Sequence, residues 1–168
     1  MLEITMKDNT GDLKKLVEAA KQRALEEIGQ QAEKFAVMKT PTDTGNLKNS
    51  MTHIVRESAA FVGSPVEYGI YVELGTGRYA SNGQGRPGWW VYVRDQNGAG
   101  VKHASEIKKI YTEAEARRIV AILRKKGLDA HMTQGIKPHH MIRDAAANHS
   151  AQYKRIIERA LQEAIEKL

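Results

Sequence analysis

The apolar residues of the chain first repeat with the period of an α-helix. Between Thr10 and Val37 they recur every three or four positions. These positions are Leu13, Leu16, Val17, Ala20, Ala24, Ile28, Ala32 and Phe35. Pro41 then stops the pattern, because proline cannot donate a backbone hydrogen bond inside a helix. We therefore predict one long N-terminal helix, whose alanine-rich face lets another element approach closely.

Shorter segments with strand character follow Pro41. Leu47–Ser58 predicts a short helical or turn start and then a strand from about Met51. Phe61–Ser64 predicts a second short strand, and Ile70–Leu74 predicts either a third strand or a helical turn. Together these segments indicate a small sheet after the long helix.

The middle of the chain begins with a change of composition. Gly75–Gly88 is rich in glycine and predicts a flexible loop. Trp89–Val93 is a dense aromatic and β-branched run, which predicts a strand. A turn is predicted at Asn97-Gly98.

A second amphipathic helix follows this turn. Thr112 and Glu115 have the spacing of a capping box, and Gly127 is placed to end the helix in a left-handed conformation. The buried stripe is predicted to be Ala116, Ile119, Val120 and Leu123. Leu128–Thr133 predicts a further strand, so this region has the pattern of a small α+β subdomain.

A last helix is predicted from about Pro138 or Met141 to Leu168, again amphipathic and rich in alanine. The fold class is therefore α+β: two long helices flank a small, mainly antiparallel sheet, with an inserted small α+β subdomain. We expect residues 1–77 and 135–168 to form the core and residues 78–134 the insert. So small a sheet leaves strand edges and helix surface open, and oligomerisation commonly covers them.

Composition narrows the class of protein. The 168 residues include no cysteine, which excludes disulfides, thiolate zinc sites and cysteine nucleophiles. No apolar run approaches the roughly 20 residues of a membrane helix, and the N-terminus lacks the pattern of a signal peptide, so we expect neither. The net charge is +6 but dispersed, and its densest clusters are Arg117-Arg118 and Arg124-Lys125-Lys126. These clusters favour a solvated helix face or a subunit contact.

Two short motifs first suggest local structure. Pro41-Thr42-Asp43-Thr44-Gly45 predicts a helix stop and restart, in which Asp43 or Thr44 caps the next element and Gly45 supplies a positive φ. Tyr71-Val72-Glu73-Leu74-Gly75-Thr76 places one carboxylate in an apolar segment before a glycine loop. Because no partner for general-base chemistry is evident, we expect Glu73 to accept hydrogen bonds or to meet a neighbouring subunit's Lys or Arg.

In this order, the motifs resemble those of the neck or tail-completion family of long-tailed bacteriophages and prophages, whose members are head–tail joining or minor structural proteins. The matching residues are Pro41, Asp43, Thr44, Gly45, Leu47, Ser50, Gly63, Tyr68, Tyr71, Val72, Glu73, Gly75 and Thr76. A third motif of the family precedes its last helix, and this chain matches it at Gly135, Pro138, Arg143 and Ala145. It departs where His140 replaces the second proline, Met141 the phenylalanine and Asp144 the last proline. The resemblance covers about residues 10–76 and 135–168 and says nothing about the insert.

The resemblance implies a structural virion protein of the neck or tail, made in the host cytoplasm, without catalytic residues or cofactor. It implies a homo-oligomeric ring, a hexamer or dodecamer, that contacts connector, stopper, tail terminator or tail tube proteins. It also implies incidental contact with phage DNA and no contact with a membrane. The candidate interface residues are Trp89, Trp90, Arg117, Arg118, Arg124 and Lys125.

Two alternative functions are a nucleic-acid-binding module and a hydrolase or nuclease, and a metal site is weighed beside them. A nucleic-acid-binding module would use helix 112–126 and the Trp89-Trp90 pair, beside Arg86 and Arg94. A hydrolase or nuclease would use Glu73, Asp43 and histidines. A metal site would need His103, His131, His139 and His140 to converge, which adjacent histidines on a loop rarely do, so we expect no metal.

Overall fold

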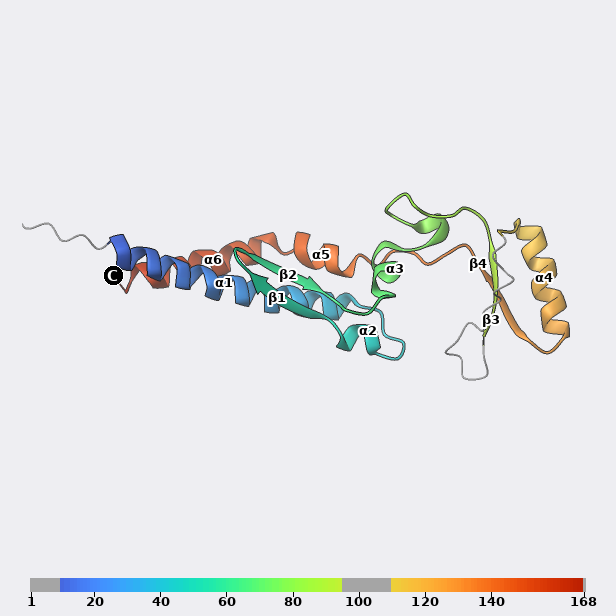
Figure 1. Cartoon of the computed structure of the whole chain (residues 1–168). Coiled ribbons are helices and arrows are strands. Elements are labelled where there is room, and N and C mark those ends of the chain that lie inside the picture. The colour runs from blue at the N-terminus through green and yellow to red at the C-terminus, as the bar shows by residue number, and fades with distance from the viewer. Residues whose placement is uncertain (1–9, 95–109, 168) are drawn as a thin grey trace, which may run out of the picture. The chain divides into compact units, whose positions relative to one another are not determined.

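The computed structural model describes residues 10–94 and 110–167, which form two compact units (Figure 1). Unit 1 comprises Met1–Val66 and Met141–Leu168, and unit 2 comprises Glu67–His140. The described chain is α+β, with six α-helices and two separate antiparallel two-stranded sheets, one in each unit. The predicted fold class is thus confirmed.

Unit 1 is built on the long helix α1 (Thr10–Lys39), as predicted. The chain then forms α2 (Asn46–Asn49) and a hairpin of β1 (Thr52–Arg56) and β2 (Ala59–Gly63). The hairpin packs along α1, and the C-terminal helices run back beside it (Figure 1). Small residues permit this packing: Ala20, Ala24, Ala32 and Ala36 of α1 are buried.

The C-terminal segment forms two helices, so the prediction of one continuous last helix is wrong. The helices are α5 (Met141–Ala147) and α6 (Ser150–Ile165). At the break, the His149 ring stacks on Phe35 of α1, with centroids 3.4 Å apart and planes 7° apart. The Tyr153 hydroxyl donates to the Ala145 carbonyl at 2.6 Å, which satisfies an acceptor that the break exposes. The contact of His149 with α1 compensates for the hydrogen bonds that are lost at the break. The apolar periodicity of the C-terminal segment cannot reveal such a contact.

The hairpin meets α1 at a glycine. A Cβ on Gly29 would lie 2.4 Å from Cδ2 of His53 on β1, so only glycine lets the two elements approach this closely. The His53 ring lies between two carboxylates of α1: Nδ1 is 2.6 Å from Glu33 Oε2 and Nε2 is 3.1 Å from Glu26 Oε1. Hydrogen bonding to Glu33 and then to Glu26 raises the pKa of His53 above its ordinary value.

Unit 2 begins with α3 (Gly69–Leu74), so the Ile70–Leu74 segment is helical and not a strand. A 3-10 turn, η1 (Gly77–Tyr79), interrupts the predicted loop. The strands β3 (Trp90–Arg94) and β4 (Asp129–Thr133) pair antiparallel, and α4 (Glu113–Lys125) packs on them (Figure 1). The predicted Asn97-Gly98 turn lies outside the described residues.

The predicted helix signals of unit 2 are confirmed. Thr112 and Glu115 form a reciprocal capping box, and Gly127 has a φ of +78° just after the helix. Ala116 and Val120 of α4 are buried against Val91 and Ala130 of the two strands. Partly buried residues complete this core: Trp89, Val93, Tyr111, Ile119, Leu123 and Met132. None of the described helices is both long and apolar enough to cross a membrane.

Candidate functional site

The second and third motifs, about 60 residues apart in sequence, pair through their backbones in unit 2. Thr76 N donates to Ile136 O at 2.9 Å, and Arg78 N donates to Gln134 O at 2.9 Å. The Thr76 hydroxyl accepts from Ile136 N at 2.9 Å. Thr76 of the second motif therefore forms hydrogen bonds to the third motif with both its backbone and its side chain.

The pairing extends into α3. His139 N donates to Val72 O at 3.0 Å, and His140 N donates to Glu73 O at 3.2 Å. Glu73 is buried, with 9% of its surface exposed, and it is engaged in the fold. His140 stands where the family has its second proline, and its φ is +49°. Proline cannot adopt this φ, so the backbone at His140 differs from the one that a proline would impose.

Glycines make the junction of the two motifs possible. A Cβ on Gly77, where φ is +59°, would lie 2.1 Å from Gln134 O and 2.4 Å from the Trp90 ring. A Cβ on Gly135, where φ is +123°, would lie 2.1 Å from Thr76 O. Both positions combine a positive φ with no room for a side chain, which explains the glycine of the third motif at 135 and the glycine that directly follows the second motif at 77.

Beside this junction lies an open cavity of about 450 Å³. Aromatic rings line it from α3 and β3, through Tyr71 and Trp90. Its polar lining comes from Thr76 and from the glycine loop, which supplies Asn82, Gln84 and Arg86. Sequence reasoning missed this cavity, because no local pattern shows that a loop residue and a strand residue face one space.

The structure separates the two adjacent tryptophans. Trp89 packs against the core under α4 and pairs with Tyr111 through two backbone hydrogen bonds of 3.0 Å. Trp90, which follows Trp89 and begins β3, lines the cavity instead. Neighbouring strand residues point to opposite faces of a sheet, so the pair cannot act as one stacking surface.

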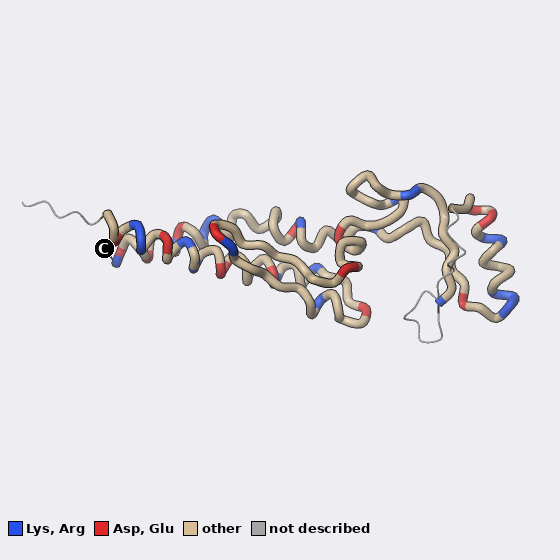
Figure 2. The backbone as a smooth tube through the Cα atoms, in the orientation of Figure 1, with Lys and Arg blue, Asp and Glu red and all other residues tan. Residues whose placement is uncertain are grey.

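The basic residues of α4 are exposed, and Figure 2 shows where they lie along the helix. Arg117 Nη2 is 2.5 Å from Glu113 Oε1, and Arg124 Nε donates to Ala130 O at 2.9 Å. Arg118 and Lys125 are exposed. Half of the candidate basic residues are thus engaged within the unit.

The first motif lies in unit 1, where it carries the chain from α1 into the hairpin. Helix α1 ends before Pro41, and the buried Thr40 hydroxyl donates to Ala36 O at 2.7 Å. Gly45 has the predicted positive φ, of +83°, and Thr44 Oγ1 accepts from Asn46 N at 3.4 Å. Leu47 is buried, as expected for the apolar residue of the motif. Asp43 is exposed.

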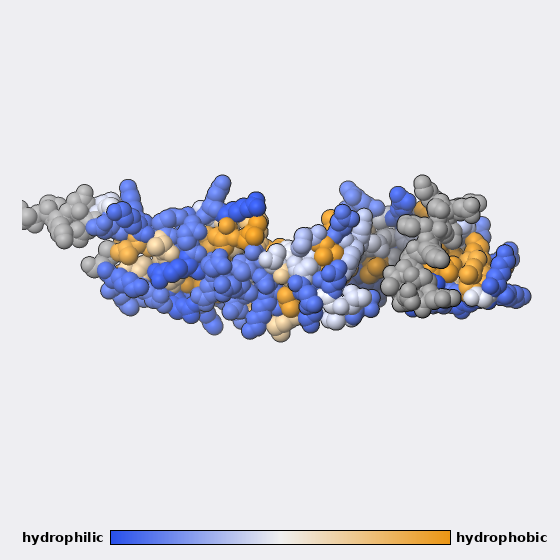
Figure 3. Space-filling view, turned by 60° about the horizontal axis from the view of Figure 1, so that its bottom comes forward, coloured by the Kyte–Doolittle hydropathy of each residue, from blue (hydrophilic) through white to orange (hydrophobic). Residues whose placement is uncertain are grey.

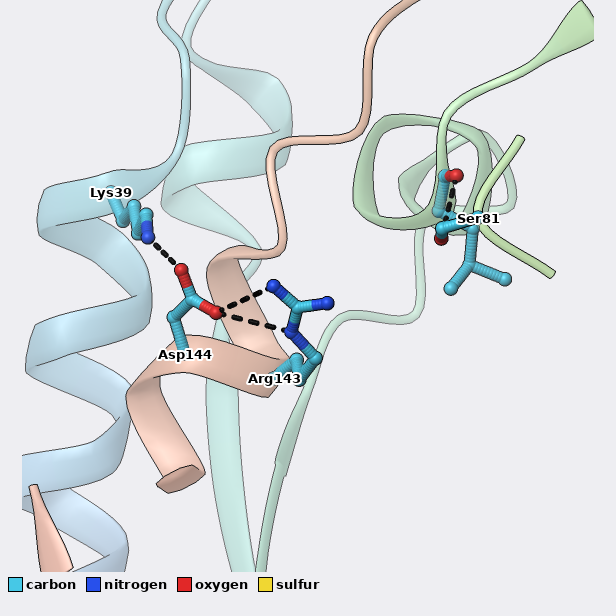
Figure 4. Close-up of polar contacts among 5 residues, drawn as sticks. Lys39, Ser81, Arg143 and Asp144 are labelled. Carbon is cyan, nitrogen blue, oxygen red and sulfur yellow. Dashed lines mark hydrogen bonds and ion pairs between the residues drawn. The ribbon is translucent and has the colours of Figure 1, made fainter. Parts of the chain in front are cut away.

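The end of the third motif ties α5 to α1 in unit 1 (Figure 4). Asp144 accepts a hydrogen bond from Lys39, and Arg143 donates from Nε and Nη2 to its other oxygen at 3.1 Å. The bond from Lys39, and then the one from Arg143, lower the pKa of Asp144. Met141, which stands where the family has phenylalanine, is completely buried. In unit 2, a separate contact in the same view joins Ser81 Oγ to the Leu74 carbonyl at 3.0 Å.

An apolar groove runs between α1 and α6 of unit 1. Its volume is about 330 Å³, and it is lined by Val17, Ala20, Lys21, Ala24, Leu25, Ser58, Ile157, Ala160 and Leu161. Leu13, Val17, Ile157, Leu161 and Ile165 are each exposed by more than a third. Figure 3 shows apolar patches among hydrophilic residues on one face of the molecule. The predicted open helix surface is therefore present on these two helices.

The structure does not place the predicted hydrolase candidates in one unit. Asp43 and Glu73 lie in different units. In the described ranges, no three His, Cys, Asp or Glu side chains come together in a way that could hold a metal ion. His103 lies outside those ranges.

Comparison with known proteins agrees with the motifs. Residues 4–75 match the family HK97-gp10_like, described as "Bacteriophage HK97-gp10, putative tail-component". No curated protein and no solved structure matches the chain. The matched segment covers α1, the first motif, the hairpin and all but the last residue of the second motif, whereas the third motif lies outside it. Residues 4–75, somewhat less than half of the chain, are therefore similar to the HK97 gp10-like family, which is described as a bacteriophage tail component.

Proposed function

We propose that this chain is a structural subunit that assembles as a ring at the head–tail junction or tail end, where it completes the tail and joins it to its neighbours. The observation that carries the self-assembly is the apolar groove of unit 1. Exposed aliphatic side chains gathered in one groove mark an interaction surface. A closed ring covers such a surface on every copy by placing it against a second surface of the next copy.

The charge of unit 1 suits contact between identical copies. By sequence, its two segments hold fourteen Lys and Arg against thirteen Asp and Glu, and both signs alternate along α1 and α6 (Figure 2). A nearly neutral, mixed surface does not repel a second copy. In this proposal the neighbours are connector, stopper, tail terminator or tail tube proteins, and the chain carries out no catalysis.

Light scattering after size-exclusion chromatography tests the ring, with negative-stain images of the same fractions. We expect a mass of six or twelve copies and annular particles. Val17→Asp places a charge in the groove and should reduce the mass to that of a monomer. Ile122→Asp, at an exposed isoleucine of α4, is the matched control and should leave the ring intact. A wild-type monomer at every concentration would contradict the proposal.

A second candidate, nucleic-acid binding, is favoured by the charge of unit 2. By sequence, Glu67–His140 contains twelve Lys and Arg against seven Asp and Glu, a net charge of +5 out of +6 for the chain. Against it, Trp89 belongs to the core, and Arg117 and Arg124 have partners within the unit. Gel-shift titration with duplex and single-stranded DNA at several salt concentrations decides the matter. Affinity that falls steeply with salt supports this candidate, and no shift at low salt removes it.

A further inference from the structure

The cavity of unit 2 has the size and lining of a binding site. Its volume of about 450 Å³ falls within the roughly 300–1,000 Å³ of ligand sites. Its lining includes two aromatic residues, Tyr71 and Trp90, together with polar residues of the glycine loop, namely Asn82, Gln84 and Arg86. Tyr, Trp and Arg are the residue types that dominate binding energy at protein interfaces.

The frame of the cavity is fixed before any ligand arrives. Thr76 and Gly77 in its wall belong to the segment that pairs with Gln134 and Ile136 through the backbone. Gly85 is also part of the wall, and a Cβ there would lie 1.9 Å from the carbonyl oxygen of Gly77. The backbone at Gly85 is therefore in direct contact with the backbone at Gly77. A site held in this way loses little conformational entropy when it binds.

Arg86 gives the cavity a preference for an anion. Within residues 10–94 and 110–167, Arg86 forms no hydrogen bond or ion pair, and it is exposed. Unit 2 carries a net charge of +5, so its field also attracts an anionic partner. A guanidinium binds a carboxylate through two parallel hydrogen bonds, which adds direction to the attraction.

The number of cations in the cavity decides between an acidic protein segment and a nucleic acid. A nucleic-acid strand needs a groove with several cations that follow successive phosphates. Arg86 is the single Lys or Arg among the described residues that line the cavity. One guanidinium beside two aromatic rings matches one carboxylate beside apolar side chains.

We propose that this cavity binds an extended segment of a partner protein, which places one Asp or Glu carboxylate on Arg86 and an apolar side chain against Tyr71 and Trp90. The inference rests on the proposed function only in that the partner would be another virion protein. The preference for an acidic segment follows from the cavity itself and does not require a ring.

A peptide titration on the full chain tests this site. The probe is acetyl-Ala-Leu-Asp-Leu-Ala-amide, and its matched control has Asn in place of Asp. Both tryptophans of the chain lie in unit 2 and one of them lines the cavity, so intrinsic fluorescence reports binding. We expect saturable binding of the Asp peptide at about millimolar concentration or below, and at least about tenfold weaker binding of the Asn peptide.

Two charge variants localise the binding. Arg86→Gln should weaken the Asp peptide at least about tenfold. Arg118→Gln removes the same charge from the exposed face of α4 in the same unit and should change the affinity less than about twofold. Thermal unfolding of both variants checks that each is folded.

Three results would overturn the proposal. They are no saturable binding of the Asp peptide, equal affinity for the two peptides, or an equal loss of affinity for the Asp peptide in Arg86→Gln and Arg118→Gln. Displacement of the peptide by a ten-residue oligothymidylate at comparable concentration would instead assign the cavity to single-stranded nucleic acid. Ring assembly is measured as mass and peptide binding as fluorescence, so either can fail while the other holds.

Discussion

The two units achieve close packing with the same residue, glycine, in two different ways. In unit 1, Gly29 lies within α1 and makes room for His53 of the hairpin. In unit 2, Gly77 and Gly135 have positive φ and bring two loop segments into direct backbone contact. The first use needs only the absence of a Cβ, whereas the second needs that absence and a conformation that other residues avoid. Substitutions should therefore cost more in unit 2.

The largest expected effect is that of Gly77→Ala. The added Cβ would clash with Gln134 O and the Trp90 ring, in a backbone region unfavourable to alanine, so we expect a loss of about 3 kcal/mol or more in the free energy of unfolding. Gly83→Ala is the matched control: φ is +72° but nothing lies within 4 Å, so about 1–2 kcal/mol is expected. Tryptophan fluorescence during urea unfolding measures both. Equal losses would show that conformation, and not the contact, matters at Gly77.

Gly29→Ala should have a smaller effect in unit 1. Alanine in a helix interior normally stabilises by about 1 kcal/mol relative to glycine. At Gly29 the methyl group must displace His53, so we expect a net destabilisation of about 2 kcal/mol. Gly11→Ala, in the same helix with open space around it, should be neutral or slightly stabilising. Far-UV circular dichroism during thermal unfolding is the measurement, and stabilisation by Gly29→Ala would remove the proposed contact.

The smallest effect is the pH dependence of the hairpin contact. Hydrogen bonds to Glu33 and Glu26 raise the pKa of His53 in the folded chain. The stabilisation of the folded state by protonated His53 is therefore complete below the unfolded pKa of 6.5, and it is lost as the pH rises through the higher folded pKa. Between pH 6 and 8.5, the free energy of unfolding should therefore fall by up to about 1 kcal/mol more for the wild type than for His53→Gln. Urea unfolding at each pH measures it. Parallel pH profiles for the two proteins would show that the ion pairs add no stability.

The described elements were predicted well where the cause is local. The periodicity of α1, the capping box of Thr112 and Glu115, and the turn at Gly127 depend on residues within a few positions of one another. The continuous last helix was predicted wrongly, because the contact that compensates for its break joins His149 to Phe35, more than 100 residues earlier. The nucleic-acid hypothesis treats the Trp89-Trp90 pair as one stacking surface, whereas in the structure Trp89 packs on the core and Trp90 lines the cavity.

The candidate site divides in the same way. The order of the motifs identified the family of the N-terminal part, which the match over residues 4–75 bears out. The order could not show that Thr76 pairs with Ile136 or that Arg86 and Trp90 line one cavity. The roles of the candidate interface residues and the boundaries of the insert remain predictions.

By itself, the sequence determined most of the helices and strands, the capping box of α4 and the resemblance of the N-terminal part to a phage tail family, because helix periodicity, caps and turns are set by neighbouring residues. The tertiary structure decided the pairing of the second and third motifs, the clamp of His53 on α1, the groove of unit 1 and the cavity around Arg86. These features depend on the distance in space between residues far apart in the chain, and that distance is set by packing, which no short segment of sequence contains.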